Sequence, residues 1–199
     1  MKVPLRFQIT NFDCGAVSLL NAFSYLFDRE EIPPELVRAI SIYTLDCYDD
    51  KGHLGEGGTS KEAVNRIAKW ITEYANENGF NVTCEYYADD EVTLDLLRNN
   101  IGSDTVLFVR CWQTGEHYSI ITAIDEDVAY FFDPYYFDEA YYNDDDSIEM
   151  IFDEPFKFNR KVKIGRLFEQ SKKDFSLCLG DKKECVVIRK TIPEYEYEK

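Results

Sequence analysis

Apolar side chains in the first part of the chain recur at the spacing of helices. Residues 14–28 are apolar on nearly every side, which predicts a buried helix. Residues 33–42 predict a shorter helix, because the proline pair at its start is tolerated in a first turn. A third helix is predicted over 61–78, with Thr59 or Ser60 as its cap and one apolar face.

The second part of the chain changes to the short apolar runs of strands, separated by one helical stretch near 90–100. Strands are predicted over 81–87, 105–112, 116–125, 128–133, 174–180 and 184–191, the last two as a hairpin, with an acidic loop at 143–146. Helices come first and strands second, with no repeat and no linker between them. This order predicts a single α+β domain over 1–192, followed by a frayed tail at 193–199.

Composition narrows the class of protein. The 199 residues carry a formal net charge of −16, which disfavours nucleic acids and anionic membranes as partners. The charge is compatible with a basic peptide as partner, but solubility alone is the simpler explanation. Apolar residues make up 45% of the chain, enough for a folded core. The first residues lack the pattern of a secretory signal, and no apolar run is long enough to span a membrane, so a cytoplasmic protein with reduced cysteines is expected.

Four residues supply the groups that thiol-based acyl transfer requires: Gln8, Cys14, His117 and Asp133. Cys14 begins the first predicted helix, where unpaired N–H groups and the helix dipole stabilise a thiolate. His117, in a predicted strand, would act as base and proton donor, and Asp133 would orient its ring. Gln8 would donate its amide to the oxyanion, together with the backbone N–H of Cys14.

Each of the four residues also has an ordinary structural interpretation. Cys14 can be a small buried apolar residue, and His117 a core histidine bonded to a carbonyl. Asp133 can be a turn residue at a strand end, and Gln8 an ordinary polar residue of an N-terminal segment. His53, the other histidine, lies in a glycine-containing loop and is expected to be solvated. The remaining cysteines form no CxxC pair and have no nearby histidine, so no metal and no cofactor is expected.

The order Gln, Cys, His, Asp resembles the papain-like cysteine peptidases of the bacteriocin-leader-processing type. The matching segments are 8–20, 57–60, 115–124 and 133–134, which are distributed over roughly the first two thirds of the chain, and the part after about residue 135 shows no match. The resemblance implies a papain-like fold of two lobes with a cleft between them. The helical lobe would span about 1–80 and the antiparallel β lobe about 81–192.

Four further residues are expected along the cleft, beside substrate. Gly15 and Gly115 would remove side-chain bulk next to Cys14 and His117. The resemblance implies that the loop with Gly58 and Thr59 runs beside the substrate backbone. That loop lacks the spacing of a phosphate-binding loop, and the acidic stretch 133–146 lacks the glycine of an EF-hand.

The resemblance implies a cysteine peptidase or amidohydrolase acting on a peptide or small amide through a thioester on Cys14. Two alternatives use the same fold. An acyltransferase would pass a thioester-borne acyl group to an amine, and a non-catalytic module would bind peptides. The intact set of Cys14, His117 and Asp133 favours an enzyme over the binding module.

Overall fold

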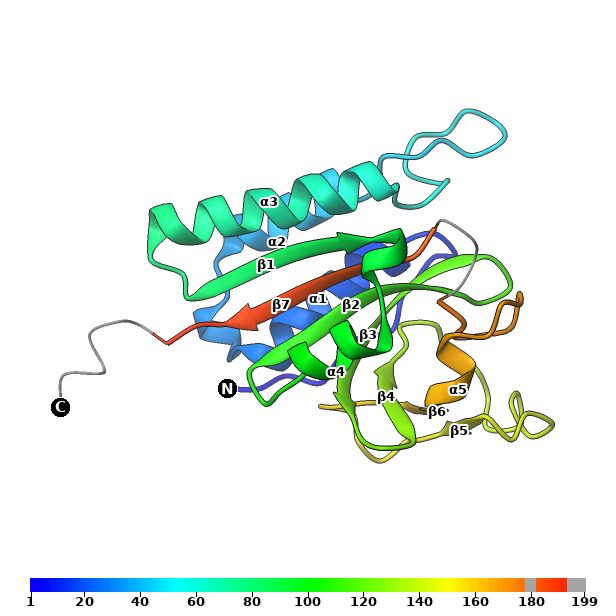
Figure 1. Ribbon diagram of the computed structural model, residues 1–199. Coiled ribbons are helices and arrows are strands. Elements are labelled where there is room, and N and C mark those ends of the chain that lie inside the picture. Colours follow the sequence, from blue (N-terminus) through cyan, green and yellow to red (C-terminus); the bar gives the residue numbers. More distant parts are fainter. Residues whose placement is uncertain (178–181, 193–199) are drawn as a thin grey trace, which may run out of the picture.

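A computed structural model describes residues 1–177 and 182–192 of the chain. Within them the helices are α1 (Cys14–Leu26), α2 (Pro34–Tyr43), α3 (Lys61–Asn78), α4 (Leu94–Asn100) and α5 (Ile164–Leu167). The strands are β1 (Val82–Ala88), β2 (Thr105–Trp112), β3 (Glu116–Ile124), β4 (Val128–Phe132), β5 (Ile148–Met150), β6 (Arg160–Lys163) and β7 (Glu184–Lys190). They form the antiparallel sheet β1-β7-β2-β3-β4-β6-β5 (Figure 1).

The α+β class and the antiparallel sheet are confirmed, and the three long helices lie where the apolar spacing predicts them. Helix α1 ends at Leu26, two residues before the predicted end at position 28, because Phe27 is already extended. Ser60 caps α3, since its side chain accepts a hydrogen bond from the backbone N–H of Ala63 at 3.0 Å. Gly79 ends that helix in the left-handed conformation, with φ of 68°.

The predicted hairpin of 174–180 with 184–191 is wrong for the residues that the structure describes. Strand β7 instead lies between β1 and β2, and pairs with both. Residues 174–177 form no strand, although the Trp112 N–H donates to the Ser176 carbonyl and the Trp112 carbonyl accepts from the Phe175 N–H. Positions 178–180 lie outside the described residues, as does the predicted tail at 193–199.

Three short elements were not predicted: β5, β6 and α5. Strand β6 reads Arg-Lys-Val-Lys, so only one of its four residues carries the apolar signal of a strand. It pairs with both β4 and β5, and these neighbours place Val162 fully inside the core.

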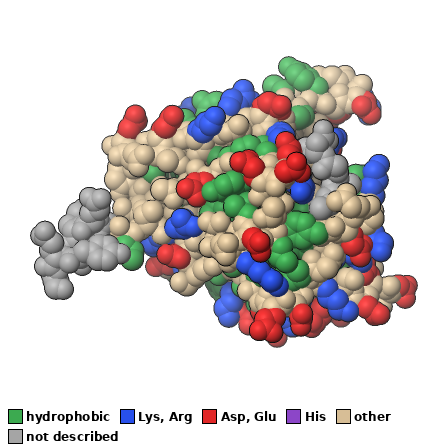
Figure 2. Space-filling view, viewed as in Figure 1, with side chains coloured by type: hydrophobic (Ala, Val, Ile, Leu, Met, Phe, Trp, Pro, Cys, Tyr) green, Lys and Arg blue, Asp and Glu red, His purple; other side chains and the backbone are tan. Residues whose placement is uncertain are grey.

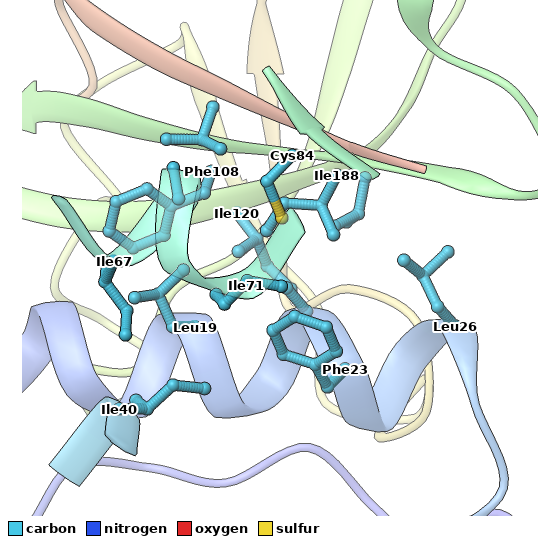
Figure 3. Close-up of a cluster of buried hydrophobic side chains, with 14 of the residues drawn as sticks. Leu19, Phe23, Leu26, Ile40, Ile67, Ile71, Cys84, Phe108, Ile120 and Ile188 are labelled. Atoms are coloured by element: carbon cyan, nitrogen blue, oxygen red, sulfur yellow. The ribbon is translucent and has the colours of Figure 1, made fainter. Parts of the chain in front are cut away.

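The two faces of the sheet bury separate apolar clusters. Alternate residues of β2, such as Phe108, face α1, α2 and α3, and this cluster includes Leu19, Ile40, Ile71 and Ile188 (Figure 3). The intervening residues face the other side, where α4, α5 and segment 135–177 cover them (Figure 1). The sheet is therefore buried on both faces.

Helix α1 is fixed on the sheet by a buried hydrogen bond as well as by apolar packing. The Ser18 hydroxyl donates to the backbone carbonyl of Tyr118 on β3 at 3.0 Å, and Ser18 is fully buried. Asn21 bonds both backbone groups of Arg6, at 2.8 and 2.9 Å, and so holds the N-terminal segment against α1. These bonds set the position of α1 along β3.

Acidic and basic side chains are interspersed over the face of the molecule shown in Figure 2. Among the described residues, none of the helices has the length and apolar character of a membrane span.

Because one face of α3 is buried, truncating a buried isoleucine should cost much more stability than truncating an exposed one. Ile71→Ala removes a fully buried side chain and should lower the free energy of unfolding by about 2–5 kcal/mol. Ile42→Ala, at a helical position that is 57% exposed, should change it by no more than about 0.5 kcal/mol. Urea denaturation of both variants checks this, and equal losses would contradict the packing described here.

Candidate active site

Cys14 is the first residue of α1, and its side chain is buried. The Asp13 carboxylate before it accepts backbone hydrogen bonds from Ile9 at 3.4 Å and Thr10 at 3.2 Å. The Asp13 side chain therefore closes the preceding loop, and makes no hydrogen bond that caps the helix. The positive end of the helix dipole is therefore available to stabilise negative charge on the Cys14 sulfur.

His117 lies near the start of β3, opposite Cys111 of β2, and is 5% exposed. Its Nε2 is 2.8 Å from Oδ1 of Asp133. A hydrogen bond also joins the imidazole to the Cys14 thiol. Because Nε2 faces Asp133, Nδ1 is the ring nitrogen left for the sulfur. The histidine thus lies between the thiol and the carboxylate.

Asp133 follows the last residue of β4 and is fully buried. Asn159 clamps its backbone: Asn159 Oδ1 accepts from the Asp133 N–H at 2.8 Å, and Nδ2 donates to its carbonyl at 2.7 Å. The carboxylate also accepts from the Gln113 side chain and from the Tyr135 N–H. These bonds fix the carboxylate facing His117.

Arg160 adds a buried positive charge beside the same carboxylate. It is 1% exposed, and its Nη2 lies 3.9 Å from Oδ2 of Asp133. Its guanidinium also donates to the carbonyls of Asn159 at 2.8 Å and Tyr135 at 3.2 Å. The four groups in order, Arg160, Asp133, His117 and Cys14, can carry charges of alternating sign.

The pKa values follow from these contacts. Burial raises the pKa of the Cys14 thiol, but the hydrogen bond and charge of His117, together with the backbone N–H groups of Tyr118 and Gly15, outweigh burial, and the net pKa is lowered. Burial lowers the pKa of His117, but the charges and hydrogen bonds of Asp133 and then of Cys14 together raise it to about 10. For Asp133 the opposing effects of burial and of His117 give a lowered pKa. The arrangement favours a thiolate beside an imidazolium.

Tyr118, the residue after His117, makes hydrogen bonds that hold Cys14 and α1 in position. Its backbone N–H donates to the Cys14 sulfur, and its carbonyl accepts from Ser18. Its hydroxyl donates to the buried Glu184 at 2.9 Å, which also accepts from Arg110 at 2.8 Å. A buried hydrogen-bond network thus fixes the strand that carries His117.

Gln8 lies beside this site, with its side chain turned to its own segment. Its backbone N–H donates to the Pro134 carbonyl at 2.8 Å, which places the segment next to Asp133. Its side-chain Nε2 donates to the carbonyl of Thr10 at 2.6 Å. Its Oε1 is buried and has no partner among the described residues.

Of the four residues expected beside the substrate, Gly115 lines the cleft at Cys14. Gly15, Gly58 and Thr59 are not among the described residues that line it. A Cβ on Gly15 would lie 2.4 Å from Oγ1 of Thr59, so this glycine lets loop 57–60 pack against the start of α1.

The cleft at Cys14 has a volume of about 510 Å³. One wall is the β2–β3 turn and its neighbours, and the other consists of rings from the segment after Asp133. The lining residues are Asn11, Cys14, Gln113, Thr114, Gly115, Glu116, His117, Tyr135, Phe137 and Tyr141. Both Cys14 and His117 are therefore accessible from an open cavity of small-molecule size.

The other histidine lies elsewhere, with a 59% exposed side chain in loop 46–58. Its ring and the carboxylates of Asp49 and Glu56 hold ligand atoms within 4.8 Å of one another. Hydrogen bonds between His53 and Asp49 account for this grouping. The other described cysteines, Cys47, Cys84, Cys111 and Cys185, all have raised pKa values because of burial.

Three residues around Asp133 were missed by reasoning from sequence: Gln113, Asn159 and Arg160. Gln113 directly follows β2, so its place in the short connection to the strand that carries His117 could have pointed to it. Asn159 and Arg160 reach the site through β6, which carries no clear strand pattern, and so gave no local signal.

No protein-family model matches the chain, and no curated protein matches it. Among solved structures, one similar chain is a double glycine motif protease from an AMS/PCAT transporter, crystallised in complex with the leader peptide. It shares 15% identity, with a TM-score of 0.49, over 96% of the present chain and 93% of its own. At these values the likeness decides neither activity nor substrate, which have to be argued from the site itself.

The contact with His117 predicts an unusual titration of Cys14. Thiolate absorbance in the ultraviolet should appear at a lower pH than for an ordinary cysteine, because the imidazolium stabilises the charge. In His117→Ala the midpoint should rise, since only the backbone N–H groups of Tyr118 and Gly15 then oppose the effect of burial. Cys14→Ala identifies the signal, and a midpoint unaffected by His117 would contradict the pairing.

Because Asn159 holds both backbone groups of Asp133, removing the Asn159 side chain should lower the stability of the fold. Asn159→Ala leaves two buried backbone groups without partners and should lower the free energy of unfolding by about 1–3 kcal/mol. Asn143→Ala, at an exposed position, should change it by no more than about 0.5 kcal/mol. Denaturation of both variants gives the comparison, and an unaltered Asn159→Ala would rule out the clamp.

Proposed function

We propose that this chain is a thiol hydrolase, a cysteine peptidase or amidohydrolase that forms a thioester on Cys14. One observation carries the proposal: the buried His117 ring contacts the Cys14 thiol on one side and the Asp133 carboxylate on the other. These residues come from α1, from β3 and from the end of β4. A nucleophile, a base and an orienting group in contact are the signature of covalent acyl transfer.

The reaction follows from these positions. The Cys14 thiolate attacks the carbonyl carbon of a bound amide, forming a C–S bond and placing negative charge on the carbonyl oxygen. The His117 imidazolium gives its Nδ1 proton to the leaving amine as the C–N bond breaks. Neutral His117 then takes a proton from water, whose oxygen attacks the thioester and releases the acid and the thiolate. Asp133 keeps the ring oriented in both steps.

Two donors are proposed for the oxyanion: the backbone N–H of Cys14 at the head of α1, and the side-chain amide of Gln8. The Gln8 Nε2 carries two hydrogens, and the bond to Thr10 uses one of them. The segment is held close to Pro134 by its backbone, which supports this role. Losing such a donor typically lowers the rate about a hundredfold or more.

We also propose the papain-like two-lobed arrangement for the chain. The helical lobe, about 1–80, would contribute Gln8 and Cys14. The β lobe, about 81–192, would contribute His117 and Asp133. The cleft supports this division, because it is lined by residues of both parts. Its open form and volume of about 510 Å³ favour a peptide or another extended amide as substrate.

Acyl transfer to an amine would use the same thioester and remains the second candidate. A purely binding role is disfavoured. Burying the imidazole and the carboxylate in contact with the thiol costs free energy, and peptide binding does not require these groups to be buried together.

Alkylation by iodoacetamide near neutral pH, mapped by mass spectrometry, tests the nucleophile. Cys14 should react before the other described cysteines, because it alone among them has a lowered pKa. His117→Ala should slow this reaction about tenfold or more, and should lower hydrolysis of a peptide library about a hundredfold or more.

His53→Ala is the matched control, since it removes the other histidine from an exposed loop. It should leave both rates unchanged. Equal labelling of Cys14 and Cys47, or no effect of His117→Ala, would refute an activated thiol. Rapid alkylation without hydrolysis, but with transfer of an acyl group from a thioester to an added amine, would favour the acyltransferase.

A further inference from the structure

Aromatic rings from the segment directly after Asp133 form one wall of the cleft at Cys14. Tyr135, Phe137 and Tyr141 all line it. The rings of Phe137 and Tyr141 are stacked, with centroids 3.7 Å apart, and Tyr135 lies 4.8 Å from Phe137. We propose that this aromatic wall is a subsite for a ring-bearing side chain of the substrate, next to the bond that Cys14 attacks. The inference rests on the proposed function.

The wall is held in place by contacts behind it. Phe137 and Tyr141 both pack edge-on against the ring of Tyr142, at 5.7 and 4.8 Å. The Tyr142 hydroxyl donates to Asp174 at 2.9 Å, and Asp174 also accepts the backbone N–H of Thr114. Since Thr114 belongs to the opposite wall, this carboxylate ties the two walls together.

A second anchor lies further along the same segment. The buried Arg166 donates to both carboxylate oxygens of Asp145, at 2.8 and 2.9 Å. Paired contacts of this kind fix geometry as well as adding energy. The rings are therefore placed before a substrate arrives, and binding does not have to order them.

The opposite wall leaves room for a large group. A Cβ added to Gly115 would meet nothing within 4 Å, so the cavity is open on that side. Tyr141 is 45% exposed although it is packed against two neighbouring rings, which leaves part of its surface available. Aromatic rings favour offset or edge contacts with a further ring, and such contacts add to the burial of apolar area.

The charge of the cleft also favours an apolar group over a basic one. Glu116 is the only carboxylate among the described residues that line it. It is already paired with Arg110, and it accepts from Lys182 at 2.7 Å. A basic substrate side chain would have to displace these two partners, whereas a ring needs no such exchange.

Two small probes test the subsite directly: acetyl-phenylalanyl and acetyl-glycyl chloromethyl ketone. In each, the Cys14 thiolate forms a C–S bond with the methylene carbon while chloride leaves. We expect the phenylalanyl probe to react about tenfold faster or more, because burial of a phenyl ring is worth at least that factor. Each rate is divided by the same protein's iodoacetamide rate, so that differences in thiol reactivity cancel.

Tyr141→Ala should lower the phenylalanyl-to-glycyl ratio about tenfold. Phe156→Ala is the matched control: Phe156 is also 45% exposed, and it lies outside the cleft, so the ratio should stay within about twofold. A wild-type ratio near one, or a high ratio that survives Tyr141→Ala, would overturn the subsite while leaving an activated Cys14 intact.

Failure of the proposed function gives a different pattern, because iodoacetamide would then not distinguish Cys14 from the other cysteines. The subsite is tested in that case by calorimetric binding of acetyl-phenylalanine amide and acetyl-glycine amide to Cys14→Ala. Tighter binding of the phenylalanine amide, lost in the added presence of Tyr141→Ala, supports the subsite. Equal binding of the two amides overturns it.

Discussion

The contact between His117 and Asp133 is the interaction on which the rest of the site depends. Both groups are buried, and each keeps its charge because the other is present. Loss of either group would leave the other buried charge with one partner fewer, and a buried charge left unpaired costs several kcal/mol. Asn159, Gln113 and Arg160 are placed around the carboxylate as a consequence. His117 in turn helps to lower the pKa of Cys14, so Asp133 acts on the thiol through the imidazole and not by direct contact.

The helices and the central strands could be predicted because each is long enough for a local apolar period to show. The second half of the sheet could not. Strands β5 and β6 are short, and β6 is mostly basic. The position of β7 between β1 and β2 depends on contacts about a hundred residues apart, which leave no mark on the local pattern. The same division holds at the site. Cys14, His117 and Asp133 stand out by residue type and order, whereas Asn159 and Arg160 matter only through tertiary contact.

The two walls of the cleft have different origins in the chain. The β2–β3 turn is part of the sheet and is fixed by strand pairing. The aromatic wall belongs to segment 135–146, which has no regular structure and is held by Tyr142, Asp174 and Arg166. Loops on a rigid scaffold are where binding preferences commonly vary. Helix α1 thus carries Cys14, the sheet carries His117, and the loop side forms the aromatic wall.

The hydrogen bond from Ser18 to Tyr118 joins residues a hundred positions apart, and it fixes the thiol-bearing helix on the strand that carries the imidazole. Cys14 lies about a hundred positions before His117 in the chain, and Asp133 and Arg160 lie later still. Until β3 and β4 have paired, His117 and Asp133 are not beside the thiol, so the imidazole does not lower its pKa. The lowered pKa of Cys14 is therefore acquired only when these distant segments have come together.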